Sequence, residues 1–316
     1  MKNQFITDIK AGDSIDDIFV LSEKNLSQKK DGNNFLNVSL SDKTGTLKGV
    51  VWDNVDQITA GVTSGDFVYI KGTVNEYKGT LQLVIKKMEA FSADEVDPAD
   101  FLPTTRRNIE DMFDRILKIT ASIETVYFRQ LIQAFLNDEN FVREFKIAPA
   151  AKKVHHAYIG GLLEHTLSMA SLADKIAGHY SGIDRDLLIA GAILHDIGKT
   201  REFEYQFRID YSDQGRLLNH IVIGIEMIDE KLTGIREFPE DQMVLLKHMI
   251  VSHHGKLENG AAKEPMFPEA VALYFADESS CKIAEMLNFI EENKDETEDD
   301  FMPKWKKNKP TNIFLR

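Results

Sequence analysis

The spacing of apolar residues changes partway along this 316-residue chain, and that change constrains the fold more than any other feature. In the first 90 residues, apolar and polar residues alternate. In FLNVSLSD (35–42), for example, Leu36, Val38 and Leu40 share one face. The stretches TLKGVVWD, GDFVYIKGTV and GTLQLVIKKM supply further strands, separated by glycine-containing turns. Several short strands joined in this way predict a small closed β-barrel.

A stretch rich in proline and acids, FSADEVDPADFLPTT, follows the predicted barrel. Beyond it the apolar residues adopt the 3.6-residue period of helices, beginning with NIEDMFDRILKITASI and continuing to about residue 290. The tail is first acidic and then basic, which predicts a solvated segment. We therefore predict a multidomain α and β protein with a barrel over 1–90, a linker over 91–105, an all-α domain over 106–290 and a charged tail over 291–316.

The later strands of the predicted barrel resemble an OB-fold of the kind that binds nucleic acid. The resemblance lies in SGDFVYIKGTV, which follows the short segment NVDQITAGV. Phe35 lies on the face opposite the leucine row and, like Trp52 and Tyr77, is a candidate for stacking on a base. The alternative is that these aromatic residues pack within the barrel or against the second domain.

The net charge of −13 opposes a broad nucleic-acid coat, because phosphate binding depends on Lys and Arg. Residues 1–90 hold 11 basic and 12 acidic side chains, which leaves a balance of −12 on the rest. Nucleic acid would therefore bind a local surface or bind through metal ions. No apolar run reaches the roughly 20 residues that span a bilayer, so we expect no membrane contact. The single cysteine, Cys281, excludes a disulfide within the chain and favours a cytoplasmic location.

Metal-type ligands recur on, or at the ends of, apolar faces of five predicted helices. A single buried histidine is usually a hydrogen-bonded core residue, but ligands that converge from several helices build metal sites in bundle cores. In AILHDIGKT (192–200), Asp196 can bridge two cations while His195 binds one of them. Gly198 lets the chain turn without blocking the pocket, and Lys199 at the pocket mouth suits a phosphate oxygen. The ligand candidates are His165, His195, Asp196, His220, His253, His254 and Asp277.

This pattern resembles the HD superfamily of metal-dependent phosphohydrolases over about residues 150–290, with HDIGK and the downstream SHHG as its specific motifs. Together with the barrel and the stretch APAAKKVHHAYIGGLLEHT, the whole chain resembles the YhaM-type 3′–5′ exoribonucleases. That family joins an OB-fold to an HD domain. Its members degrade RNA, and sometimes single-stranded DNA, with Mn²⁺-type metals.

The resemblance implies a site for two metals. His156, in the HHA stretch, would orient substrate, start a helix or support a metal ligand by a hydrogen bond. Arg201 and Arg216 are candidates for contacts with the nucleic-acid backbone. Ser280 stands where related HD domains often carry a second acid. Metal one would take His165, His195, Asp196 and Asp277, and metal two would share Asp196 and add His220, His253 and His254.

We therefore expect a metal-dependent phosphodiesterase that degrades single-stranded RNA, or single-stranded DNA, from the 3′ end. A hydroxide that bridges two divalent ions would be the nucleophile, Asp196 and Lys199 would be catalytic, and the barrel would hold the strand. Cleavage direction and RNA preference are implied by the resemblance alone. The expected metal is Mn²⁺, with Fe, Mg²⁺, Co²⁺ and Ni²⁺ as alternatives.

Other functions and the oligomeric state remain open at this point. The leading alternative is an HD phosphohydrolase acting on a nucleotide or cyclic dinucleotide, with the barrel used for assembly. A di-iron redox enzyme fits less well, because Lys199 suits phosphate. A non-catalytic RNA-binding protein is disfavoured by the complete ligand set. The sequence leaves open whether the chain forms a homo-oligomer.

Overall fold

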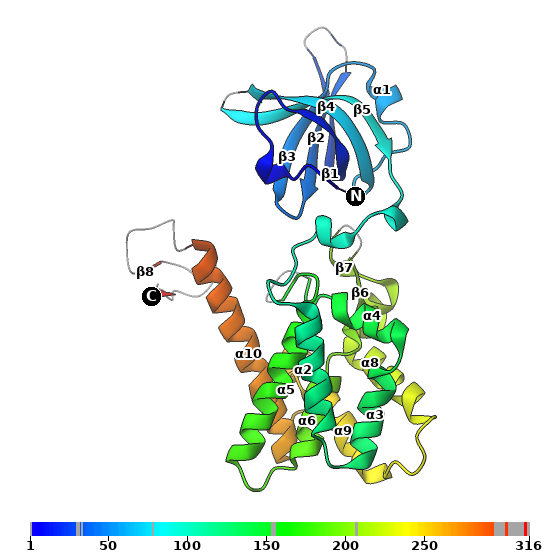
Figure 1. Cartoon of the computed structure of the whole chain (residues 1–316), viewed down its shortest axis with the longest axis vertical. Coiled ribbons are helices and arrows are strands. Elements are labelled where there is room, and N and C mark those ends of the chain that lie inside the picture. The colour runs from blue at the N-terminus through cyan, green and yellow to red at the C-terminus, as the bar shows by residue number, and fades with distance from the viewer. Residues whose placement is uncertain are drawn as a thin grey trace. The chain divides into compact units, whose positions relative to one another are not determined.

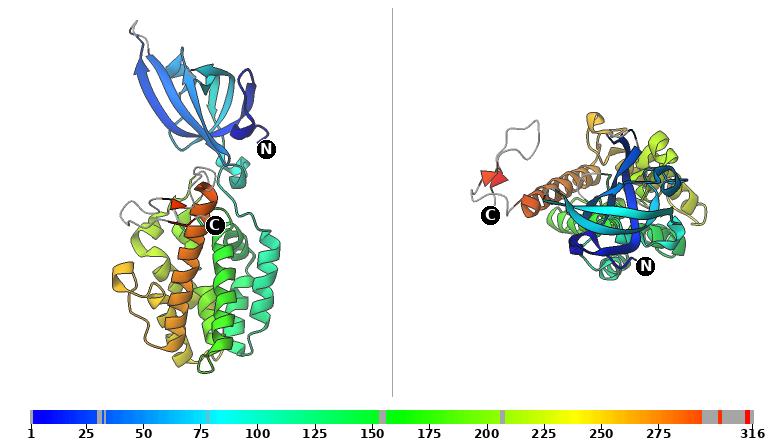
Figure 2. Two further views of the ribbon diagram at one scale, coloured as in Figure 1. Left: turned by 90° about the vertical axis from the view of Figure 1, so that its left-hand side faces the viewer. Right: turned by 90° about the horizontal axis from the view of Figure 1, so that it is seen from above.

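The chain folds into two compact units, one with strands and one with helices (Figures 1 and 2). The structure is a computed structural model that describes residues 2–29, 32, 34–77, 79–152, 156–205, 208–293, 301–302 and 313–314. The first unit comprises Met1–Thr104 and Glu204–Asp210, and the second comprises Thr105–Phe203 and Tyr211–Arg316. Along the described part of the chain, no helix combines the length and apolarity needed to cross a membrane.

The first unit is a closed five-stranded barrel with the strand order β1-β2-β3-β5-β4. All neighbouring pairs are antiparallel except β3 with β5, which is parallel. A short helix, α1, lies between β3 and β4, and this arrangement confirms the predicted OB-fold. The elements are β1 (Ser14–Gln28), β2 (Asn34–Asp42), β3 (Gly45–Val51), α1 (Val55–Ile58), β4 (Phe67–Tyr77) and β5 (Thr80–Ala90).

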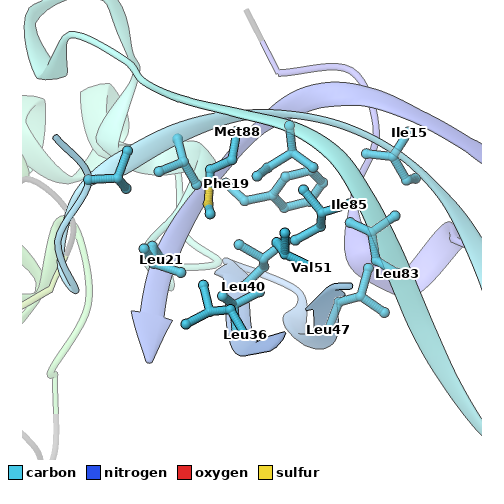
Figure 3. Close-up of a cluster of buried hydrophobic side chains, with 14 of the residues drawn as sticks. Ile15, Phe19, Leu21, Leu36, Leu40, Leu47, Val51, Leu83, Ile85 and Met88 are labelled. Atoms are coloured by element: carbon cyan, nitrogen blue, oxygen red, sulfur yellow. The ribbon is translucent and has the colours of Figure 1, made fainter. Parts of the chain in front are cut away.

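Side chains of one face of each strand fill the barrel. Leu36, Val38 and Leu40 are buried there, as their alternation predicts. They pack in one cluster with side chains from the other strands, including Phe19 and Leu83 (Figure 3). The opposite face of β2 is left to more polar or half-buried residues, among them Phe35.

The strand β1 departs from simple alternation, because both of its faces are buried around residues 18–21. Phe19 points into the barrel core, whereas Ile18 and Val20 belong to a second cluster with Phe67 and Phe101. Phe101 comes from the stretch 91–105, whose short 3₁₀ turns Ala93–Glu95 and Pro98–Asp100 precede it. Most of this stretch therefore packs on the outside of the barrel as part of the first unit.

The second unit is built from helices around one fully buried helix, α6 (Figure 1). Every residue of α6 from Asp186 to Leu194 is buried, so its C-terminal end lies inside the unit. Asp184 caps the start of this helix by accepting the backbone N–H groups of Asp186 and Leu187. The helices are α2 (Ile109–Ala121), α3 (Val126–Leu136), α4 (Glu139–Ile147), α5 (Gly161–His179), α6 (Arg185–Leu194), α7 (Lys199–Glu202), α8 (Asp213–Leu232), α9 (Glu240–Ser252) and α10 (Pro268–Asn293).

The remaining described elements are small. The strands β6 (Phe203–Glu204) and β7 (Asp210–Tyr211) form one two-stranded sheet, and a 3₁₀ turn covers Leu257–Asn259. In the predicted charged tail, β8 (Phe301–Met302) pairs with β9 (Ile313–Phe314). The rest of that tail, from residue 294 on, lies outside the described residues, and the prediction of a solvated tail stays untested there.

Candidate metal centre

Four of the predicted ligands form a first cluster inside the helical unit. The Nε2 atom of His165 lies 3.2 Å from Nε2 of His195, 3.3 Å from Oδ1 of Asp277 and 3.5 Å from Oδ2 of Asp196. The His195 Nε2 atom lies 3.4 Å from the same Asp196 oxygen. Two imidazole nitrogens and two carboxylate oxygens thus converge on one point, as the ligands of a metal ion do.

The remaining predicted ligands form a second cluster that begins at the other oxygen of Asp196. Its Oδ1 atom lies 3.5 Å from Nε2 of His220 and 3.7 Å from Nε2 of His253. Each of His220, His253 and His254 offers one ligand atom within 4.8 Å of the other two. The structure therefore brings together all seven predicted ligands, and Asp196 lies between the two sets with one oxygen in contact with each.

Helix ends deliver most of these side chains. His195 and Asp196 follow the C-terminal end of α6, and His253 and His254 follow that of α9. The C-terminal end of a helix carries partial negative charge, which attracts cations. His165 and Asp277 come from within α5 and α10. The ends of α6 and α9 therefore favour cations at the clusters, and the two carboxylates add to this attraction.

Hydrogen bonds on the far side of the histidine rings fix the nitrogens that face the clusters. The Nδ1–H group of His195 donates to the carbonyl of Ala192, and that of His253 donates to the carbonyl of Ile250. Each Nε2 atom is then left with a lone pair directed into the site. Among the described residues, five buried polar atoms of the clusters have no hydrogen-bond partner: His165 Nδ1, Asp196 Oδ1, His220 Nε2, His253 Nε2 and His254 Nδ1. Several orphaned acceptors around one carboxylate fit a divalent cation.

The protonation states also suit metal ligands. Burial lowers the pKa of His253 well below its ordinary value and lowers that of His254, so both rings are neutral at neutral pH. Burial opposes ionisation of Asp196, but the nearby Lys199 ammonium holds its pKa well below the usual range. Asp277 is half-buried, and its hydrogen bond with His165 holds its pKa below the usual range. Both carboxylates are therefore charged.

Gly198 and Lys199 contribute differently from the sequence-based expectation. Gly198 has helical backbone angles, so it is not needed for an unusual turn. A side chain there would instead clash with backbone, because its Cβ atom would lie 2.0 Å from the carbonyl oxygen of His220. Lys199 has a largely buried side chain, and its ammonium donates to Asp196 Oδ2 at 2.7 Å. The ammonium thus lies against the first cluster.

Sequence reasoning missed Glu202 and Asn219. The buried Glu202 carboxylate accepts hydrogen bonds from both Nδ1 and the backbone N–H of His220. Asn219 breaks α8 with φ of 58°, and its side chain accepts the backbone N–H of Ile221 to start the helix again. The sequence signal available was weak: an acid seven residues after His195, and an asparagine directly before His220.

The predicted substrate contacts of the helical unit lie in different surroundings. His156 is buried, its Nδ1 atom is 2.8 Å from the hydroxyl of Tyr158, and its ring lies 5.7 Å from that of His165. His155, of the same HHA stretch, lies outside the described residues. Arg201 is exposed and pairs with Glu230. Arg216 is also exposed, and it donates to the carbonyl of Tyr211. The hydroxyl of Ser280 lies 3.3 Å from that of Ser168.

The barrel brings two of its three candidate aromatic residues together. The rings of Phe35 and Trp52 stack at 5.2 Å with an angle of 24° between their planes. Trp52 is 42% exposed, and the Lys29 ammonium lies 5.7 Å from its ring. Tyr77 is exposed at the end of β4. An exposed tryptophan, stacked on a half-buried phenylalanine and lying beside a lysine, has the chemistry of a base-stacking platform.

Comparison with known families agrees with this arrangement. Residues 162–280 match the family model described as the HD domain, and residues 20–90 match the one described as an OB-fold nucleic acid binding domain. Residues 93–181 match a further model described as "Putative helicase". The HD domain indicates a metal-dependent phosphohydrolase and implies divalent-metal binding, and two clusters of metal-type ligands are present. The OB-fold beside it supports a nucleic-acid-related HD hydrolase.

Solved structures that match part of the chain include an OB-fold domain, a single-stranded DNA binding protein and a tRNA synthetase. The chain is similar to the second OB-fold domain of replication protein A from Methanococcus maripaludis, with 20% identity over 29% of this chain and 96% of that one, at a TM-score of 0.24. The mitochondrial single-stranded DNA binding protein Rim1 from S. cerevisiae matches at 18% identity over 26% and 97%, with a TM-score of 0.23. An aspartyl tRNA synthetase from Entamoeba histolytica matches at 12% identity over 54% and 41%, with a TM-score of 0.21.

Proposed function

We propose that this protein is a metal-dependent exonuclease that degrades single-stranded RNA from the 3′ end and also accepts single-stranded DNA. The observation that supports this most is the pair of ligand clusters joined by Asp196, in a chain that also contains an OB-fold. The direction of cleavage and the preference for RNA rest on the resemblance to the YhaM-type exoribonucleases. The barrel would hold the strand whose end is cleaved in the helical unit.

The two clusters would hold two divalent cations. His165, His195 and Asp277 would bind the first, and His220, His253 and His254 would bind the second, with Asp196 shared. The five histidines favour a transition metal over Mg²⁺, and Mn²⁺ is our proposed ion. Bound cations would act as Lewis acids on the phosphodiester and make water a nucleophile at neutral pH.

The side chains around the cations would position and neutralise the phosphate. Asp196 contributes one oxygen to each cluster and so fixes the distance between them. Lys199 is our candidate for a phosphate contact. Its ammonium donates one hydrogen bond to Asp196 Oδ2 at 2.7 Å, and its other two N–H groups would be available to a phosphate oxygen.

Digestion of end-labelled strands tests this function. Single-stranded RNA and DNA, labelled at the 5′ or the 3′ end, would be incubated with Mn²⁺, Mg²⁺ or a chelator. We expect release of a labelled mononucleotide at once from 3′-labelled strands, a ladder from 5′-labelled strands, and no reaction with chelator. Hydrolysis of small nucleotides or cyclic dinucleotides in the absence of strand cleavage would contradict the proposal and favour the alternative phosphohydrolase.

Replacing His220 with alanine is expected to weaken the second cation more than the first. His220 contributes Nε2 to the second cluster only, 3.5 Å from Asp196 Oδ1. Activity in micromolar Mn²⁺ should fall sharply and return in part at millimolar Mn²⁺. The exposed His179 of α5 supplies the matched control, because His179→Ala should change neither metal content nor rate. Loss of activity that no Mn²⁺ concentration restores, with a folded protein, would contradict a separate second site.

Replacing Trp52 with alanine is expected to weaken strand binding and leave the chemistry intact. Stacking on one base contributes about 1–3 kcal/mol, so the affinity for a single strand should fall about 5- to 150-fold. Fluorescence anisotropy of a labelled oligonucleotide in chelator measures binding without cleavage. Tyr180→Ala removes an aromatic side chain from the helical unit that is even more exposed than Trp52, at 58% against 42%, and should leave affinity unchanged. Equal affinities of the Trp52→Ala variant and the wild type would exclude Trp52 as a platform.

A further inference from the structure

Glu202, which belongs to neither ligand cluster, lies directly behind the second one. Its side chain is buried, and its Oε1 atom lies 3.1 Å from Nδ1 of His220 and 3.0 Å from the backbone nitrogen of the same residue. A carboxylate can only accept these bonds, so Nδ1 of His220 carries the proton. The Nε2 atom is then the lone-pair nitrogen, and it is the atom that faces Asp196.

Close contacts fix the main chain of Glu202. Ser212 donates its N–H group to the Glu202 carbonyl at 2.9 Å. Gly215 packs so closely on the same carbonyl that a Cβ atom there would lie 2.2 Å from it. The Glu202 side chain therefore extends from a fixed point of the main chain to His220.

Glu202 also offsets an unfavourable feature of His220. Because Asn219 breaks α8, His220 stands at the N-terminal end of the helix that runs on to Leu232. Such an end carries partial positive charge and repels cations, unlike the ends of α6 and α9. The Glu202 carboxylate accepts a hydrogen bond from the backbone N–H group of His220 at that end. Its negative charge offsets the partial positive charge of the helix end.

The two clusters differ in charge. The first contains two carboxylates, Asp196 and Asp277. The second has three histidines and the shared Asp196, and Glu202 is the carboxylate bonded to one of those histidines. The other fixed rings, His195 and His253, donate to uncharged backbone carbonyls instead. A carboxylate behind a metal-bound imidazole makes that ligand more basic and fixes its orientation.

From these contacts we infer that Glu202 is a positioning residue that sets the affinity of the second cation site through His220. The inference rests on the proposed two-cation site but goes beyond it, because it assigns the control of one cation to a residue outside both ligand sets. Removing the charge of Glu202 should weaken the second cation about 10- to 100-fold and leave the first unchanged.

The test is Mn²⁺ binding to the full-length protein, measured by equilibrium dialysis with metal analysis and by electron paramagnetic resonance of the coupled Mn²⁺ pair. Glu202→Gln is the informative variant, since its amide oxygen can still accept both hydrogen bonds from His220 and only the charge is lost. Glu204→Gln removes the same charge from an exposed position two residues further on and is the matched control. The His220→Ala variant identifies which binding step belongs to the second site.

We expect Glu202→Gln to weaken the binding step that His220→Ala weakens most. The variant should also lose the coupled-pair signal at Mn²⁺ concentrations that saturate the wild type, and it should keep the melting temperature of the metal-free protein. Unchanged binding, or equal weakening of both steps, would overturn the inference. If Glu202→Gln does not fold, Glu202→Asp keeps the charge but draws the carboxylate away from His220 Nδ1, so it should weaken the same binding step, and unchanged binding would overturn the inference. A wild-type protein that binds one Mn²⁺ would refute the inference together with the two-cation site, whereas two cations without strand cleavage would refute only the exonuclease proposal.

Discussion

Replacing Asp196 with asparagine is expected to abolish hydrolysis and to lower the content of both metals, while the fold is retained. Asp196 is the residue whose two oxygens face different clusters, so losing its charge affects both. The loss of activity should exceed the about 10²–10³-fold that follows removal of a single transition-state hydrogen bond. Asparagine keeps an oxygen that can accept from Lys199, which avoids leaving that ammonium buried without an acceptor.

Asp186→Asn is the matched control for this variant. Asp186 is also buried and lies at the opposite end of the same helix, where it accepts the backbone N–H groups of Glu124 and Thr125. Its replacement should reduce stability without changing metal content. Metal analysis, thermal unfolding and the rate on a labelled strand distinguish the two variants. Turnover by Asp196→Asn at the wild-type rate would refute the bridging role.

The barrel could be predicted from sequence where one face of a strand is buried and the other is solvated. That condition holds for β2, where Leu36, Val38 and Leu40 alternate with polar neighbours. It fails in β1, because Ile18 and Val20 are covered by Phe101 while Phe19 lies inside the barrel. A continuous apolar run results, and alternation gives no signal. The same contact explains why much of the predicted linker belongs to the first unit.

The ligand types of the candidate site could be predicted, because polar groups on apolar helices need partners. The residues that hold those ligands could not. Glu202 and His220 are 18 positions apart, and their contact depends on how α7 and α8 pack. The break in α8 at Asn219 could not be predicted from the apolar pattern. The helix starts again directly after it, because the Asn219 side chain accepts the backbone N–H group of Ile221. Periodicity identifies faces of helices, but it carries no information on which ends meet.

Replacing Gly198 with alanine is expected to damage both stability and the second cation site. The added Cβ atom would lie 2.0 Å from the carbonyl oxygen of His220 and 2.7 Å from the backbone nitrogen of Gly224. Both neighbours are backbone, so rotation of a side chain cannot relieve the clash. Overpacking of this kind costs about 1–3 kcal/mol or more, which lowers the melting temperature by about 2–4 °C for each kcal/mol.

The clash also predicts where the function fails. Relief requires α8 to move away at His220, and this movement withdraws Nε2 from Asp196. The second cation should therefore bind more weakly than the destabilisation alone accounts for, as Mn²⁺ dialysis at a temperature well below unfolding would show.

Gly224→Ala supplies the matched control from the other side of the same contact. Its Cβ atom would meet its nearest neighbour, the Gly198 nitrogen, at 3.5 Å, an ordinary contact distance. Alanine is also the better helix former by about 1 kcal/mol, so this variant should be as stable as the wild type or more so, with unchanged Mn²⁺ binding. If Gly198→Ala behaves in the same way, the spacing between HDIGK and His220 does not depend on the absence of a side chain. The glycine of that motif would then need a different explanation.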